Sequence, residues 1–259
     1  MPAATRAHVV SSFTLIKGTM IEETYAVFRD WDLARSKKEN LDRLRDENYI
    51  GVRSATWLRD VGKVLNRRFD PSGADRALVV LAKASMAAPE WNPILLWHMT
   101  RDEFLLRDFL LNWLYPEFES GALRPRPDDV AVFVDSVAAR GGVREHKWSP
   151  ATKSRVAAGL MRAAVDFGLL TGSVVKQFAS FHLPERSFLY VAHALGESYA
   201  NAGQLVRAPD WRMFLMDPGD VERELLRLHQ YRKLSYESAG TLGQLTLPYA
   251  TALAYAEAC

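Results

Sequence analysis

Apolar residues recur every three or four positions along most of the chain, a spacing that places them on one face of an α-helix. This pattern predicts helices over residues 19–31, 37–49, 54–69, 74–87 and 101–115. The last segment is apolar almost all round, so we expect it at the centre of a helical bundle. The stretch "GALRPRPDD" from Gly121 holds two prolines that cannot continue a helix. We therefore expect an N-terminal helical lobe over residues 1–125 and a C-terminal lobe over residues 126–259.

In the C-terminal half, a predicted helix is twice followed by a short strand pair. Residues 149–172 have an N-cap serine, a proline in the first turn and closing glycines, and the alternation over 173–184 suggests strands. Residues 217–232 predict another helix, and a hairpin over 233–247 is expected to turn at residues 239–240. Helix followed by a two-stranded wing is typical of winged-helix elements. The pattern predicts a mainly α fold with small β-hairpin wings.

One predicted helix pair has the outline of a helix-turn-helix. It is the segment "ENYIGVRSATWLRDVGKVLNRRF", residues 47–69, with a turn at Gly51. On the second helix, Trp57, Val61 and Val64 share an apolar face. The opposite face carries cationic residues spaced four apart, Arg59, Lys63 and Arg67. Residues 50–68 hold five basic residues and one acidic residue, a local charge of +4.

A helix buried on one face and cationic on the other is suited to the major groove of duplex DNA. Arg53, Ser54 and Thr56 stand at its N-terminus, where hydroxyl and backbone N–H groups could bind a phosphate. The alternative is a solvated surface helix whose arginines pair with carboxylates of the preceding helix. Arg68 points toward the apolar side, and we expect it only to extend along that side to solvent.

A second basic segment covers residues 140–155, with five basic residues against Glu145 alone, again +4. It lies at the start of the first proposed winged helix, so we expect phosphate contacts from Lys147, Lys153 and Arg155. Trp148 in the same segment is expected to belong to the core.

Composition restricts the remaining classes of function. The 259 residues carry a net charge of only +2, from 33 basic and 31 acidic residues, so affinity for polyanions must come from local clusters. Cys259 is the only cysteine, which excludes an intramolecular disulfide and a cysteine zinc site. The N-terminus lacks the pattern of a signal peptide, and no apolar run is long enough for a membrane helix. We expect a soluble, cytoplasmic protein that does not insert into membranes.

No motif for catalysis is convincing. Pro127-Asp128 followed by Glu145-His146-Lys147 resembles the set of Mg²⁺-dependent nucleases, but that chemistry requires strands of a central sheet and here the pattern predicts a loop. "GESYA" at Gly196 lacks the strand and the second glycine of a nucleophile elbow. The six histidines show no metal-binding spacing, and we expect no catalytic residue, metal or cofactor. The nuclease remains the third of three hypotheses.

Several segments occur in an order that resembles the BrxA family, accessory proteins of bacterial BREX (bacteriophage exclusion) defence systems. They are "KGTMIEET", "ENYIGVRSATWLRDVGKVLNRRF", "RDEFLLRDFL", "WSPATKSRVAAGLMRAAVDFGLL", "FLYVAHAL" and "DWRMFLMDPGDVERELLRL". Family members have been labelled inner-membrane proteins, and this sequence has no span that fits that label.

The resemblance implies an all-helical fold similar to NusB with winged-helix character, no enzymatic activity, and binding of double-stranded DNA. The family motif "RS…T" falls on Arg53, Ser54 and Thr56. The segment "RPRPDD" does not match the family pattern, which leaves the boundary between the lobes open. Expected partners are duplex DNA and other BREX proteins. The second hypothesis is a protein-interaction scaffold that docks other defence components through apolar helices over residues 91–115.

Overall fold

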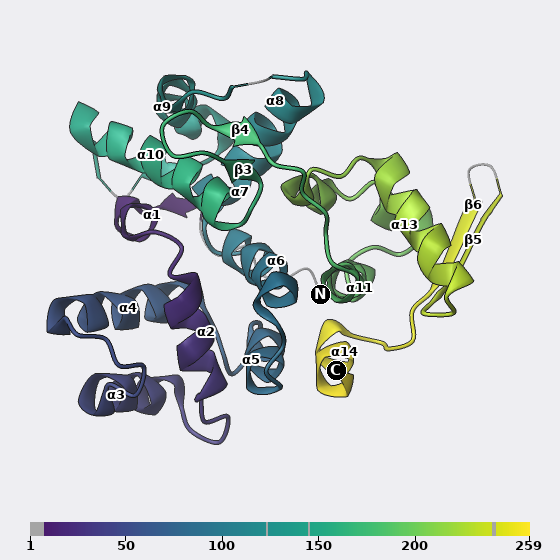
Figure 1. The fold of residues 1–259 in the computed structure, drawn as a ribbon, viewed down its shortest axis with the longest axis horizontal. Helices are drawn as coiled ribbons and strands as arrows, with labels where there is room; N and C mark the ends of the chain where they lie inside the picture. Colours follow the sequence, from purple (N-terminus) through teal and green to yellow (C-terminus); the bar gives the residue numbers. More distant parts are fainter. Residues whose placement is uncertain (1–7, 123, 145, 240–241) are drawn as a thin grey trace.

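The computed structural model describes residues 8–122, 124–144, 146–239 and 242–259. Within them the chain is mainly helical, with short strands that pair two by two (Figure 1). The mainly α prediction is therefore confirmed. None of the described helices is both long and apolar enough to cross a membrane.

The N-terminal half begins with a two-residue strand and continues as helices. Its elements are β1 (Val9–Val10), α1 (Ser12–Lys17), α2 (Ile21–Arg29), α3 (Lys37–Glu47), α4 (Ala55–Arg68), α5 (Arg76–Lys83), α6 (Ala88–Thr100), α7 (Phe104–Phe109), the π-helical turn η1 (Leu110–Leu114) and α8 (Tyr115–Glu119). The predicted helices over residues 19–31, 37–49, 54–69, 74–87 and 101–115 are all present, with ends that differ by a few residues.

The C-terminal half alternates helices with short strands. Its elements are α9 (Pro127–Asp135), η2 (Val137–Arg140), β2 (Val143–Arg144), α10 (Pro150–Asp166), β3 (Leu170–Thr171), β4 (Gln177–Phe178), α11 (Glu185–Gly196), α12 (Ala202–Val206), η3 (Pro209–Phe214), α13 (Pro218–Gln230), β5 (Ser235–Ala239), β6 (Leu242–Thr246) and α14 (Ala252–Ala258). Strand β2 pairs in parallel with β1, so the start of the described chain is tied to its middle.

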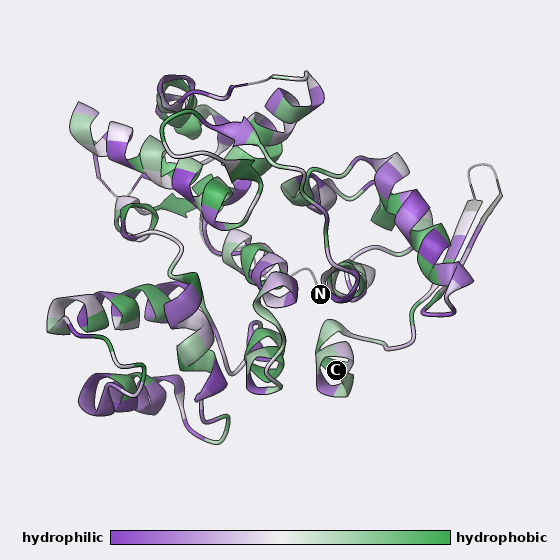
Figure 2. Cartoon of the chain, in the orientation of Figure 1, coloured by the Kyte–Doolittle hydropathy of each residue, from purple (hydrophilic) through white to green (hydrophobic). Residues whose placement is uncertain are grey.

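The run α7–η1 is buried, as its all-round apolar pattern predicted, whereas α8 is mostly exposed after Tyr115. Leu105, Phe109, Leu110 and Leu114 are buried. The helices around them also carry hydrophobic residues, which are coloured green in Figure 2. Burial of this much apolar surface is the main source of folding free energy.

Each of the two hairpins follows a long helix, α10 and α13. The second hairpin is present within residues 233–247 and pairs Ser235 with Thr246. The expected turn at residues 239–240 was wrong for Ala239, which belongs to β5 and pairs with Leu242, and Gly240 lies outside the described residues. For the first, the prediction over 173–184 was partly wrong: the pair joins Leu170–Thr171 to Gln177–Phe178. Gly172, with φ +96°, ends the first strand earlier than the alternation suggested. The likeness of these units to winged helices, and of the whole to NusB, stays a prediction.

Contacts cross the predicted lobe boundary at residue 125. Helix α1 packs against α10, and α14 packs against α5. At Gly159 of α10, an added Cβ atom would lie 2.5 Å from the carbonyl oxygen of Leu15. The division into lobes over 1–125 and 126–259 stays a prediction.

Candidate nucleic-acid interface

The turn between α3 and α4 is built by three polar or small residues. Asn48 ends α3 in the left-handed region with φ 45°. Its side chain accepts a hydrogen bond from the Val52 N–H at 3.0 Å and donates to the Val52 carbonyl at 2.8 Å. Gly51 also has a positive φ, +69°, which glycine adopts without strain. Ser54 then caps α4 by accepting from the Trp57 N–H at 3.2 Å.

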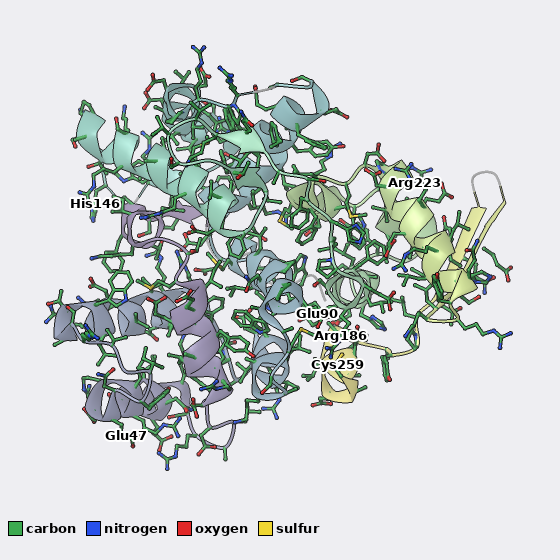
Figure 3. The ribbon with its side chains drawn as sticks, in the orientation of Figure 1. Glu47, Glu90, His146, Arg186, Arg223 and Cys259 are labelled. Atoms are coloured by element: carbon green, nitrogen blue, oxygen red, sulfur yellow. The ribbon has the colours of Figure 1, made fainter. Side chains whose placement is uncertain are left out.

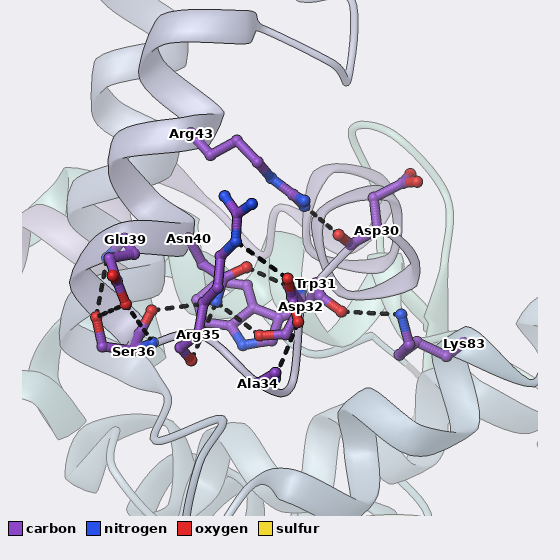
Figure 4. Close-up of polar contacts among 10 residues, drawn as sticks. All are labelled: Asp30, Trp31, Asp32, Ala34, Arg35, Ser36, Glu39, Asn40, Arg43 and Lys83. Carbon is purple, nitrogen blue, oxygen red and sulfur yellow. Dashed lines mark hydrogen bonds and ion pairs between the residues drawn. The ribbon is translucent and has the colours of Figure 1, made fainter.

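Hydrogen bonds near its N-terminus fix the preceding helix α3 in place. Ser36 and Glu39 form a capping box, and Asn40 is completely buried. The Asn40 amide accepts from the Asp32 N–H at 2.8 Å and donates to the Asp32 carbonyl at 2.9 Å (Figure 4). These bonds set the direction of α3 and hence the position of the turn that follows.

Helix α4 separates into a buried and an exposed face, as the sequence predicted. Val61, Val64 and Leu65 are buried, and Trp57 is half-buried and donates its indole N–H to Glu23 of α2 at 2.9 Å. The opposite side and the preceding turn are exposed at Arg53, Ser54, Thr56, Arg59 and Lys63. Arg67 is half-buried rather than exposed.

Among the described residues, the carboxylates of α3 form no ion pair with the exposed cations of α4. Asp42 accepts from Lys38 and from Arg45, each at 2.8 Å, and Arg45 also pairs with Asp46 at 2.8 Å. The hydrogen bond from Lys38 keeps the pKa of Asp42 below its ordinary value. Within the described part of the chain, Arg53, Arg59 and Lys63 form no ion pair with a carboxylate.

The one acidic residue of α4 is directed away from the exposed face. Asp60 is buried and its carboxylate lies 2.5 Å from the ammonium of Lys17 on α1. The hydrogen bond from Lys17 holds the pKa of Asp60 below its ordinary value, so this acid is ionised and paired at neutral pH. The negative charge in the segment is therefore offset by a residue from another helix.

The expectation for Arg68 was wrong, because its guanidinium does not reach solvent. Arg68 is 1% exposed, and its Nε lies 3.0 Å from Glu103. Its terminal nitrogens donate to the carbonyls of Thr14 at 2.9 Å, Gly18 at 2.9 Å and Thr19 at 3.1 Å. The sequence did not indicate that three backbone carbonyls and a carboxylate converge on the apolar side of α4 and accept hydrogen bonds from Arg68.

The second basic segment is less available than its sequence suggested. Lys147 and Arg155 are exposed, but Lys153 pairs with Asp135 of α9 at 2.5 Å. Arg140 pairs with Asp108 at 2.8 Å. His146, next to Lys147, is exposed at the edge of the molecule (Figure 3). Trp148 is buried, which confirms its assignment to the core.

Residues 12–19 connect the two basic elements. Lys17 joins α4 through Asp60, while Thr19 donates to Asp166 at the end of α10 at 2.7 Å. Helix α1 packs on α10. In Figure 1, α4 and the first half of α10 lie on the same side of the molecule, with α1 beside them. Both cationic segments therefore belong to one connected part of the fold.

Among the described residues, the candidate catalytic motifs do not assemble into a site. Asp128 is exposed in the first turn of α9, and Glu145 lies outside the described residues. Gly196 is the last residue of α11, which agrees with the absence of a nucleophile elbow. No group of three or more His, Cys, Asp or Glu residues suited to a metal ion occurs among the described residues.

Sequence reasoning missed a buried polar group in the middle of the protein. His98 lies 2.6 Å from an Asp75 carboxylate oxygen through Nδ1 and 2.7 Å from the Tyr190 hydroxyl through Nε2. Burial lowers the pKa of His98 and raises that of Tyr190, so both are neutral near pH 7. The only signal in the sequence was a histidine in an apolar segment, which is common in cores.

Comparison with known proteins places the chain in a family. A search of the curated proteins finds no match. The family model named BrxA matches residues 12–194, which include α4 and α10 and so both basic segments. The match covers more than half of the chain, and this protein therefore belongs to the BrxA family.

Proposed function

We propose that this protein binds duplex DNA without catalysis, as part of a BREX defence system, through the exposed face of α4. Membership of the BrxA family implies a component of BREX phage defence. The observation that carries the DNA proposal is the state of Arg53, Arg59 and Lys63. All are exposed, and in the described part of the chain none is neutralised by a carboxylate.

Exposed lysine and arginine side chains on a fixed helix are suited to binding the phosphates of the DNA backbone. Each phosphate neutralised by lysine or arginine releases a bound counterion, which drives binding. Because α4 is buried on its other face, the cations keep their spacing along the helix. Ser54 and Thr56 are exposed at the same end of α4 and add hydroxyl groups for a phosphate oxygen.

The segment at the start of α10 supports the proposal with fewer residues. Lys147 and Arg155 are exposed and serve as backbone contacts in the proposal. Lys153 must first leave Asp135, so its contribution is smaller. Arg67 adds to the first face through the part of its side chain that reaches solvent.

The apolar surface that the scaffold hypothesis requires is not exposed. It relied on the apolar residues between positions 91 and 115, yet Trp91, Leu95 and Leu106 are buried within this chain. They are not available for docking another protein. The nuclease hypothesis has no supporting geometry among the described residues either.

Electrophoretic mobility shift with random duplex DNA over a salt series tests the proposal. About five to seven neutralised phosphates should give a slope of log affinity against log salt of roughly −4 to −6. The Arg59/Lys63/Arg67 triple alanine variant should bind much more weakly and with a shallower slope. An Arg35/Lys38/Arg45 triple alanine variant is the matched control, since it removes the same charge from the neighbouring surface.

The proposal is wrong if the α4 variant, with wild-type circular dichroism, binds DNA as tightly as the unmodified protein. Equal losses in the two triple variants would also contradict it, because only net charge would then matter.

A further inference from the structure

Gly62 lies in the middle of α4, although glycine is one of the poorest helix formers because it loses the most backbone freedom when a helix forms. A Cβ atom added at Gly62 would have no described atom within 4 Å outside its own stretch of helix. Gly159 of α10 differs, since there the Leu15 carbonyl oxygen would lie 2.5 Å from the new atom. The packing of the described residues therefore explains the glycine in α10 and not the one in α4.

Gly62 belongs to a row of residues along one side of α4. With 3.6 residues per turn, positions 55, 59, 62 and 66 lie one above another on the surface of the helix. Ala55, Arg59 and Asn66 are exposed and Gly62 is half-buried, so the row borders the exposed face that carries Lys63. Small residues therefore alternate along this row with residues that form hydrogen bonds.

The side chain of Asn66 is exposed, and its amide forms no hydrogen bond with a described residue. The backbone at this position is held firmly, because the Lys37 ammonium donates to the Asn66 carbonyl at 2.5 Å and to the Phe69 carbonyl at 2.6 Å. An amide offers an oxygen that accepts hydrogen bonds and an NH2 group that donates them. This combination pairs with N6 and N7 at the major-groove edge of adenine.

The short side chain of Asn66 reaches a base only if α4 itself enters the groove. Lysine and arginine side chains are longer, so Arg59 and Lys63 can contact phosphates from a helix that stays outside. The major groove is about 12 Å wide and a helix with its side chains is about 10–12 Å across, so the fit is tight. Because Gly62 has no side chain, it leaves room on the flank of α4 for the sugar–phosphate strand that forms the wall of the groove.

The exposed side of α4 presents no negative charge to a duplex. Asp60 is the only acidic residue of the helix, and it is buried and paired with Lys17 at 2.5 Å. The exposed residues of α4 are cationic or neutral: Ala55, Thr56, Arg59, Lys63 and Asn66. In Figure 1, α4 lies at the periphery of the molecule beside α3. The charge and the position of this face therefore both suit a polyanion.

We propose that α4 lies in the major groove of duplex DNA and that Asn66 pairs with adenine there. One sugar–phosphate strand passes Gly62, where a side chain would hold it away, while Arg59 and Lys63 contact phosphates. This inference rests on the proposed DNA binding and adds to it, because the protein then reads base edges as well as phosphates. Its affinity therefore depends on the sequence of the duplex.

Mobility shift of the full chain with two duplexes of the same mixed sequence tests the inference. One duplex contains adenine, and the other contains 7-deazaadenine at every adenine position. The replacement changes the N7 acceptor into a C–H group and leaves the phosphates in place. The wild-type protein should bind the adenine duplex about fivefold or more tightly than the other, since an amide that pairs with adenine supplies at least this much discrimination.

Variants connect this preference to α4. Asn66→Ala and Gly62→Ala should each bring the affinities for the two duplexes to within about twofold of each other. Neither variant removes a cation, so the salt dependence should stay as in the wild type. Gly62→Ala is expected to raise the melting temperature, so its weaker binding cannot come from unfolding. Gln204→Ala removes an exposed amide from α12 and should keep the full preference.

The inference is wrong if the wild-type protein binds the two duplexes equally, or if Asn66→Ala or Gly62→Ala keeps the full preference. These outcomes leave the proposed DNA binding intact when the Arg59/Lys63/Arg67 triple variant binds more weakly and with a shallower salt slope. A triple variant that binds as the wild type does contradicts the proposed function itself. Absence of any duplex binding by the wild type would overturn both.

Discussion

The Nε of Arg68 lies 3.0 Å from the Glu103 carboxylate, and both side chains are almost entirely shielded from solvent. The second Glu103 oxygen accepts from the Thr14 hydroxyl at 3.0 Å. The pair thus connects the end of α4 and the start of α7 to residues 14–19, whose carbonyls also accept from Arg68. A cation here also lies at the negative end of the α4 dipole.

Removing one partner of this pair should be much more costly than removing both. Arg68→Met leaves the Glu103 charge buried and unpaired, and we expect a loss of about 3–5 kcal/mol in the free energy of unfolding. Adding Glu103→Leu should recover part of that loss, although the carbonyls of Thr14 and Gly18 stay without their donor. Urea unfolding of both single variants and the double variant measures the coupling. Additive losses would show that the two charges do not stabilise each other.

Replacing each of two helical glycines by alanine should change the stability of the protein in opposite directions. Gly62 of α4 has open space around a new Cβ atom, so Gly62→Ala should stabilise by about 0.5–1 kcal/mol through helix propensity. At Gly159 the same atom would lie 2.5 Å from the Leu15 carbonyl oxygen, so Gly159→Ala should destabilise despite the propensity. Melting temperatures of the pair test this, and a rise for both would show that α1 can move away from α10.

Freeing Lys153 should strengthen the proposed DNA contact. Asp135→Asn removes the carboxylate that lies 2.5 Å from the Lys153 ammonium, so affinity for random duplex should rise and the salt dependence should steepen by about one phosphate. Asp220→Asn, which removes a half-buried acid paired with Arg223 on α13, is the control for net charge. Mobility shift at several salt concentrations measures both. An equal rise in the two variants would place Lys153 outside the interface.

Acid should destabilise the protein through His98. Its pKa in the folded state is below the ordinary 6.5, mainly because of burial, so the unfolded chain binds the proton more readily. Stability is complete above about pH 6.5 and is lost as the pH falls toward the lowered value. His193, also lowered by burial, acts in the same direction. Urea midpoints at pH 7.5 and 5.5 should differ less in His98→Gln than in wild type, while the exposed His146→Gln should keep the full difference.

Features with local signals were predictable, and features made by distant contacts were not. The ends of α4 follow from Ser54 and the apolar pattern. Helix α6 was expected only as part of the apolar helices over residues 91–115, and its own bounds were not predicted. Pro93 within it cannot donate a backbone hydrogen bond. Its burial outweighs that cost.

The same distinction holds for the candidate sites. The exposure of Arg59 and Lys63 could be predicted from the helical period, whereas the pairing of Lys153 required the contact between α9 and α10. The group of Asp75, His98 and Tyr190 spans separations of 23 and 92 residues, so no short motif could indicate it.

The attachment of both α4 and α10 to residues 12–19 would determine the length of duplex that can contact both helices. Two cationic helices on one shared spacer cannot adjust their separation independently, so the length of duplex that engages both is set by the protein. Duplexes shorter than that length would contact only one of the two helices. The affinity should therefore rise in a step, and not smoothly, as the duplex is lengthened.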